Sequence, residues 1–143
     1  MNQSEKRLFL IQSLLKERPE YRNMGIPADT NSQCQLLRGL MNIRAPRRTD
    51  GAFLKTQDEY LQGETAAKGI TDIAGLTPIQ PGLYLWQGDI TTLRCDAIVN
   101  AANSGMTGCY IPNHRCIDNA IHTFAGVELR LACEKLMEQQ GYP

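Results

Sequence analysis

The stretch DAIVNAAN, residues 96–103, places a short apolar run directly before two asparagines. Its centre, residues 97–99, has the composition of a buried β-strand bounded by polar residues. A second apolar run, residues 83–86, lies shortly before it and predicts another strand. Because a loop and two helices are expected to follow these strands, the order of elements predicts an α/β domain.

The chain after these strands changes character twice. Residues 104–113 contain Gly, Ser, Thr, Pro and Asn with no hydrophobic period, which predicts a loop. Residues 117–125 and 127–140 have helical spacing and are separated by Gly126, which is typical of a helix end. On the second of these helices, the side chains expected inside are Leu129, Ala132, Cys133, Leu136 and Met137.

The chain before the strands is expected to be helical. The first predicted helix covers residues 5–18, with Ser4 as its cap and Pro19 as its stop. The second begins at a cap among residues 29–31 and ends near Asn42, and the third covers residues 53–68. On the second helix, the buried face is expected to consist of Leu36, Leu37, Leu40 and Met41. We therefore divide the chain into a helical N-terminal extension, residues 1–76, and an α/β domain, residues 77–143. Since two strands make only a marginal sheet, we expect this sheet to be incomplete and the chain truncated.

Composition excludes several classes of protein. The chain has 143 residues with 15 basic and 15 acidic side chains, so it lacks the positive excess of a nucleic-acid-binding or membrane-surface protein. It has no apolar run of about 18 residues, and charges interrupt its N-terminal apolar stretch, so neither a membrane span nor a signal peptide is predicted. A cytoplasmic location follows as the expectation. The five cysteines are an odd number and are predicted to be reduced thiols, some of them metal ligands.

Asn100 and Asn103 are candidate ligand-binding residues. In α/β sheets, ligands bind beyond the carboxyl ends of the strands, where these two asparagines are expected. An amide can both donate to and accept from a sugar diol. The alternative is that both asparagines only cap turns.

Cys109, His114 and Cys116 are the candidate metal ligands, because they bring two thiols and an imidazole into one loop. Zinc accepts these donors, and three protein ligands with an open fourth position is its catalytic arrangement. The spacing is not that of a zinc finger, so ordinary buried cysteines beside a surface histidine remain an alternative. Cys116 directly precedes the predicted helix at residue 117, whose free N–H groups favour an anion.

Other chemically notable residues are expected to be structural. His122 has the spacing for a general base or a fourth ligand, but a half-buried helix histidine is favoured. Cys34, Cys95 and Cys133 are expected to be small core residues, and Trp86 is expected in the core. The basic loop at residues 44–48 could bind phosphate, although we expect its arginines to face water.

Three segments together resemble the ADP-ribose-binding macrodomain: QGDIT at residues 87–91, DAIVNAAN at 96–103, and IDNAIH at 117–122 with Ala125-Gly126 after it. The loop holding Cys109, His114 and Cys116 resembles the zinc-dependent bacterial branch of that family, which are protein-ADP-ribose hydrolases. The resemblance implies a three-layer α/β/α sandwich, of which this chain would carry the first part after a helical extension.

The resemblance also implies roles for single residues. Asp89 would bind the adenine amino group, and Ile90 would contact the adenine ring. Asn103 would hold the distal ribose with support from Asn100. Together with Asn103, the catalytic residues would be the three zinc ligands. The diphosphate and its adjoining ribose would bind the backbone N–H groups of Ile117, Asp118 and Asn119.

The activity implied by the resemblance is zinc-dependent removal of mono-ADP-ribose from modified proteins. Its implied protein substrate is a lipoylated carrier related to the glycine-cleavage H protein, and its implied functional partner is a sirtuin-type ADP-ribosyltransferase. Two alternatives are a non-catalytic module that only binds ADP-ribose, and an inactive fragment.

Overall fold

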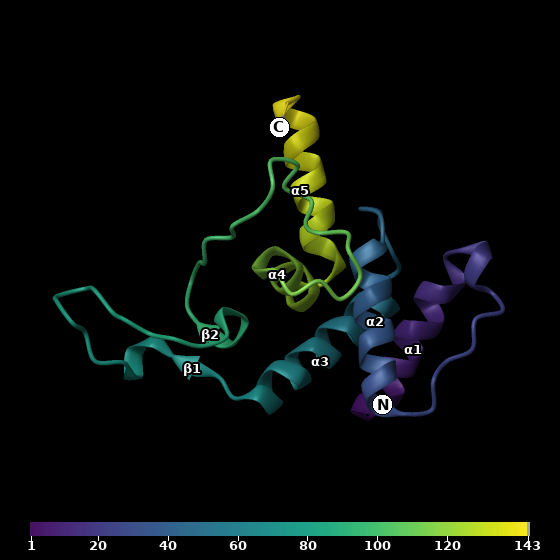
Figure 1. The fold of residues 1–143 in the computed structure, drawn as a ribbon, viewed down its shortest axis with the longest axis horizontal. Helices are drawn as coiled ribbons and strands as arrows, with labels where there is room; N and C mark the ends of the chain where they lie inside the picture. Colours follow the sequence, from purple (N-terminus) through teal and green to yellow (C-terminus); the bar gives the residue numbers. More distant parts are fainter. Residues whose placement is uncertain (143) are drawn as a thin grey trace.

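The computed structural model describes residues 1–142, and it combines helices with a short sheet, which confirms the predicted mixed α/β class. Figure 1 shows the N-terminal helices α1 and α2 side by side, with α3 leading away from them toward the sheet, and α4 and α5 following a long irregular stretch. The bounds of the elements are α1 (Gln3–Lys16), η1 (Pro19–Tyr21), α2 (Thr30–Ile43), α3 (Gly51–Lys68), β1 (Thr71–Asp72), η2 (Ile73–Gly75), η3 (Ile90–Thr92), β2 (Leu93–Arg94), α4 (Ile117–Ala125) and α5 (Val127–Gln140).

The three N-terminal helices begin at side-chain caps. The cap of α1 is Asn2 rather than the expected Ser4, because Asn2 and Glu5 form a reciprocal capping box with bonds of 2.8 and 2.9 Å. Asp29 accepts from the N–H of Ser32 at the start of α2, within the predicted range of caps. Asp50 does the same at the start of α3. All three predicted helices are confirmed, with ends shifted by one or two residues.

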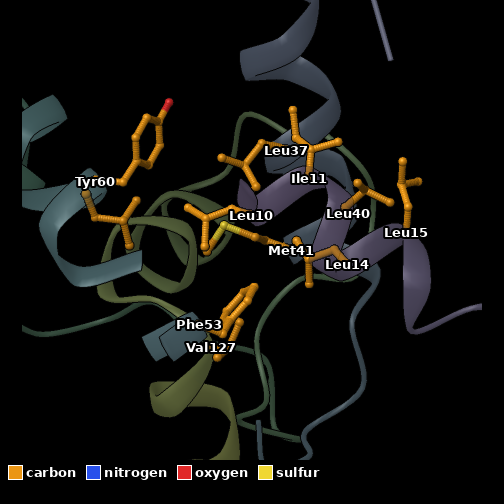
Figure 2. Close-up of a cluster of buried hydrophobic side chains, with 11 residues drawn as sticks. Leu10, Ile11, Leu14, Leu15, Leu37, Leu40, Met41, Phe53, Tyr60 and Val127 are labelled. Carbon is orange, nitrogen blue, oxygen red and sulfur yellow. The ribbon is translucent and has the colours of Figure 1, made fainter. Parts of the chain in front are cut away.

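The hydrophobic core lies among α1, α2 and α3, and the first residue of α5 joins it (Figure 2). The helical spacing on α1 and α2 brings their apolar faces together there, as predicted for α2 except that Leu36 is half-buried. The core side chains are Leu10, Ile11, Leu14, Leu15, Leu37, Leu40, Met41, Phe53, Tyr60, Leu61 and Val127. The extension therefore has a core of its own, and α5 begins against it.

A buried ion pair joins the end of α1 to the residues after α2. Arg44 is 3% exposed and donates to the Glu17 carboxylate at 2.9 Å, while Arg47 donates to the same carboxylate at 2.7 Å. The expectation that all arginines of this loop face water is thus wrong for Arg44. Burial raises the pKa of Glu17, but the hydrogen bonds and positive charges of Arg44 and Arg47 lower it by more, so the pKa lies below its ordinary value.

The sheet consists of β1 and β2, which pair in parallel with Thr71 opposite Leu93. The predicted strands at residues 83–86 and 97–99 are wrong: only an isolated bridge joins Gln80 to Leu83, and residues 97–99 are irregular. No strand of the described chain lies alongside either run, so their backbone groups have no ladder to join. Their side chains accordingly stay exposed, Leu85 by 79% and Val99 by 90%.

Both C-terminal helices are confirmed at the predicted residues, but the buried face of α5 differs from the prediction. Val127 and Arg130 are the buried residues of α5, and the apolar positions predicted inside are half-buried or exposed. The start of α5 is held by Gln57 of α3, which is fully buried and accepts from the N–H of Val127 at 2.8 Å. This bond anchors α5 on α3 through its first turn.

Several residues expected in the core lie at its edge. Cys34, Cys95 and Cys133 are free thiols of intermediate exposure, and Trp86 is also half-exposed. These four side chains are therefore partly covered by protein and partly open to solvent.

Within residues 1–142, no helix has both the length and the apolar character that crossing a bilayer requires. The boundary between residues 76 and 77 stays a prediction.

We predict that Glu17→Gln lowers the free energy of unfolding by about 2 kcal/mol at pH 7, because it leaves the Arg44 charge buried without its counter-ion. The folded-state pKa of Glu17 lies below its ordinary value of 4.5, so its stabilisation is present above pH 4.5 and is lost as pH falls through the lowered value. Urea unfolding of both proteins between pH 3 and 7 measures this difference.

The matched control is Glu20→Gln, because Glu20 is exposed and its carboxylate forms an ion pair with Arg18 at 3.6 Å. This variant should stay within about 0.5 kcal/mol of the parent. Equal effects of the two substitutions would contradict the role given to the buried pair.

Candidate metal site and its supports

Cys109, His114 and Cys116 converge in the loop before α4, as the sequence predicts. Their ligand atoms all lie within 4.8 Å of one another, and Cys109 Sγ lies 3.6 Å from His114 Nδ1. Tetrahedral zinc bonded to sulfur at about 2.3 Å and to nitrogen at about 2.0 Å separates these two atoms by roughly 3.5 Å. The donor set and this spacing therefore fit zinc. His114 is exposed and the two cysteines are half-buried, so the cluster opens to solvent.

The cluster lies at the N-terminus of α4. Cys116 is the N-cap residue, and its sulfur accepts from the N–H of Asn119 at 3.4 Å. The Asn119 N–H, expected to receive a diphosphate, is therefore already bonded in this conformation. Among the described residues, the backbone N–H groups of Ile117 and Asp118 make no hydrogen bond. These two groups and the helix dipole leave a place for an anion beside the thiols.

Helix α2 holds the loop from one side. Arg38 donates to the backbone oxygen of His114 at 3.1 Å and to the side-chain oxygen of Asn119 at 2.8 Å. The side chain of Asn42 accepts from the N–H of Asn113 at 2.9 Å. A Cβ on Gly39 would lie 3.2 Å from the Asn113 amide, so the loop lies against the surface of α2. The helical extension thus contacts the residues on both sides of His114.

Arg130 of α5 joins the loop to the end of α2. Its guanidinium is 5% exposed and donates to carbonyl oxygens of both segments, and it lies 4.1 Å from the Tyr110 ring centroid. The acceptors on the α2 side are Met41, Asn42 and Arg44, at 2.7 to 3.2 Å, and those on the loop are Thr107 at 2.7 Å and Cys109 at 3.3 Å. One buried cation therefore satisfies the carbonyl groups of two segments distant in sequence.

Asn100 lies where it can order the first turn of α4. Its side chain donates to Asp118 at 2.8 Å, and Asp118 is 4% exposed. The side-chain oxygen of Asn100 is buried without a hydrogen-bond partner in residues 1–142. Asn100 therefore contributes more than the turn cap that was the alternative for it.

His122 is buried rather than half-buried, and it is not part of the metal cluster. Its Nε2 lies 3.6 Å from Asp118, one turn earlier on α4. Its ring contacts Gly108, which has φ +89° and would bring a Cβ within 2.8 Å of the ring. Burial lowers the pKa of His122 and Arg130 lowers it further, against the opposing effect of Asp118. A neutral imidazole at neutral pH follows.

Asn103 is exposed and shapes the loop that leads to Cys109. Its side chain donates to the carbonyl of Gly108 at 3.3 Å and accepts from the N–H of Gly105 at 3.0 Å. This is the turn-capping geometry that the sequence left open for it. It places Asn103 beside the residue that precedes the first metal-ligand candidate.

Asp89 and Ile90, the expected adenine contacts, lie at η3, which packs on α3 and α4. The Asp89 carboxylate accepts from Thr91 at 2.9 Å and from Lys68 at 3.3 Å. Partial burial raises the pKa of Asp89, but the hydrogen bonds from Thr91 and Lys68 lower it by more, so the pKa lies below its ordinary value. Asp89 is therefore a carboxylate at neutral pH, with Lys68 already beside it. The neighbouring Ile90 lines a pocket with Phe124 and Ala125 at the C-terminal end of α4, whereas the metal loop lies at the N-terminus of that helix.

The supports of the site, Arg38, Asn42 and Arg130, could not be identified from the sequence. Each lies on a helix whose pattern indicates only an amphipathic face. The one available signal is that Asn42 and Arg130 occupy positions next to predicted core residues.

Comparison with known proteins assigns the family. The Macro domain family model matches residues 99–143, which include the metal loop, α4 and α5. A protein-ADP-ribose hydrolase of Treponema medium is 54% identical over 99% of this chain and 56% of its own length. The chain belongs to the macro domain family.

Further relatives of this macro domain chain carry related names. A protein-ADP-ribose hydrolase of Staphylococcus aureus (strain MRSA252) is 42% identical over 93% of the chain and 50% of its own length. A probable bifunctional ADP-ribose hydrolase/ADP-ribosyltransferase of Fusarium oxysporum is 40% identical over 79% of the chain and 21% of its own length. The chain spans about half the length of the first two relatives. Both of these alignments include most of the helical extension.

We predict that Arg130→Met destabilises the chain by about 3 kcal/mol and weakens metal binding by the loop about tenfold or more. The substitution leaves buried carbonyl groups of α2 and of the loop without a donor. Chemical unfolding and competitive titration with Co²⁺, followed by its visible absorption, measure the two effects.

Lys135→Met is the control, because Lys135 is exposed on the same helix. It should leave both quantities close to those of the parent. A folded Arg130→Met protein with parental Co²⁺ affinity would rule out support of the loop by this side chain.

Proposed function

We propose that this chain carries the zinc loop of a hydrolase that removes mono-ADP-ribose from modified proteins. The observation that carries the proposal is the Cys109, His114 and Cys116 cluster at the N-terminus of α4, in a macro domain whose relatives are named protein-ADP-ribose hydrolases. A module that only binds ADP-ribose has no need of a thiol and imidazole cluster. The cluster therefore favours hydrolysis over simple binding.

The reaction breaks the bond between the anomeric carbon of the distal ribose and an oxygen of the protein side chain. Water supplies a hydroxyl to the ribose and a proton to the side-chain oxygen, so the products are ADP-ribose and the free side chain. When bound by Cys109, His114 and Cys116, zinc would supply a Lewis acid beside the distal ribose. The protein's own residues bind and orient the substrate around it.

The positions of these residues support the roles proposed for them. The free N–H groups of Ile117 and Asp118 would bind the diphosphate, with the Asn119 N–H joining them if it leaves Cys116. Asn103, next to the loop, would hold the distal ribose, and Asn100 would fix Asp118. Asp89 and Ile90 would bind adenine, which requires the Asp89 carboxylate to share or give up its contact with Lys68.

The partners belong to the same proposal. ADP-ribose and a mono-ADP-ribosylated protein are the ligands, and the family resemblance favours a lipoylated glycine-cleavage H-like carrier modified by a sirtuin-type transferase. A cytoplasmic location fits these partners.

We predict that the purified chain binds about one zinc ion and that Cys116→Ser loses both the zinc and hydrolysis, because one thiolate ligand is removed. Elemental analysis gives the zinc content. Release of ADP-ribose from a mono-ADP-ribosylated protein gives the activity, and calorimetry with ADP-ribose gives binding.

The control is Cys133→Ser, since Cys133 is a half-buried thiol of α5 outside the cluster. It should keep zinc and activity. If the zinc-loaded parent binds ADP-ribose but releases none from a mono-ADP-ribosylated protein, the hydrolase assignment is wrong and the chain is a binding module. Zinc absent from the parent would overturn the metal assignment.

A further inference from the structure

A groove of about 460 Å³ lies beside the metal loop. None of the residues proposed above to bind zinc or ADP-ribose lines it. Its walls come from α2, α3, α4 and the loop itself. The loop contributes Asn113 and Arg115, which flank His114 on either side. The groove therefore begins at residues adjacent to a metal-ligand candidate.

The loop end of the groove is rich in hydrogen-bond donors that have no protein acceptor. Arg115 is exposed, and its guanidinium makes no hydrogen bond or ion pair within residues 1–142. The side-chain amide of Asn113 and Nη1 of Arg38 likewise have no acceptor among the described residues. Such donors, two of them cationic, are complementary to a carboxylate.

The rest of the groove differs in chemistry. Its lining also includes the apolar side chains of Leu37, Leu61 and Phe124, and the Glu64 carboxylate, which accepts from Gln3 at 3.0 Å. Apolar side chains together with two arginines beside the loop suit a short peptide segment that carries an acidic side chain close to the loop. The Glu64 carboxylate among the lining residues would repel the phosphates of a second nucleotide.

We propose that this groove binds the protein part of the substrate, as a short segment with an acidic side chain next to the modified residue. The inference rests on the proposed function, because the protein is attached at the distal ribose and must leave the site past the metal loop. Arg115 is the residue that recognises the acidic side chain. The helical extension, which forms two of the walls, thereby contributes to substrate choice.

The test uses a synthetic mono-ADP-ribosylated peptide with two aspartates beside the modified residue, and a twin peptide with asparagines there. For the parent chain, KM should be about tenfold lower for the aspartate peptide, since a charge-assisted hydrogen bond is gained. Arg115→Ala should remove this preference, and Arg115→Lys should restore part of it. Arg22→Ala, at an exposed arginine outside the groove, is the control and should keep the preference.

Gln35→Trp tests the groove without touching the loop, because Gln35 is exposed on α2 and lines the groove. It should raise KM for both peptides and leave calorimetric binding of free ADP-ribose unchanged. Unchanged KM in Gln35→Trp, or an equal preference in Arg115→Ala and the parent, would overturn the groove as the peptide site. Weaker binding of free ADP-ribose by Arg115→Ala would also overturn it and assign Arg115 to the nucleotide.

Fluorescence anisotropy with the unmodified aspartate peptide separates this inference from the proposed function. Peptide binding that needs Arg115, in a chain that neither binds nor releases ADP-ribose, would support the groove and reject the hydrolase. ADP-ribose release with no peptide preference would do the reverse.

Discussion

The buried guanidinium of Arg130 is the contact on which the arrangement of the site depends. It joins three structures that the chain makes separately: the C-terminal end of α2, the loop carrying Cys109, and α5 itself. A charge buried this deeply is tolerated because carbonyl dipoles surround it and the Tyr110 ring covers one face. The same contact satisfies carbonyl groups that a helix end leaves free. Arg38 and Asn42 then fix the second half of the loop on α2.

The helices could be predicted from the sequence because their signals are local. The cap at Asp29 and the proline after α1 define helix ends within a few residues in the chain. Equally clear apolar runs predict the strands, yet residues 83–86 and 97–99 form no strand, and all but Trp86 are exposed. A strand is stable only with a neighbour, and a neighbour is not a property of the run itself. The buried face of α5 likewise depends on which neighbour the helix packs against, so its apolar positions are half-buried or exposed while Arg130 is buried.

The candidate site divides in a similar way between local and non-local information. The three metal-ligand candidates lie within eight residues, so their convergence follows from one loop and could be proposed from spacing alone. The roles of Arg38, Asn42 and Arg130 depend on how α2 and α5 pack on that loop, and no pattern within either helix encodes it. Asn100 is intermediate: its place after an apolar run suggested a ligand contact, and the structure gives it Asp118 as a partner.

The anchoring of the loop on α2 has a thermodynamic consequence. Consider a ligand that binds the loop only while the loop is held on α2. Binding and attachment of the loop to α2 are then linked, so the ligand stabilises the attachment by the same free energy that the attachment adds to binding. Such a ligand would therefore also stabilise the contacts that Arg38, Asn42 and Arg130 make between the loop and α2. For such a ligand, loop occupancy and the stability of the extension would be coupled, although the two lie in separate parts of the chain.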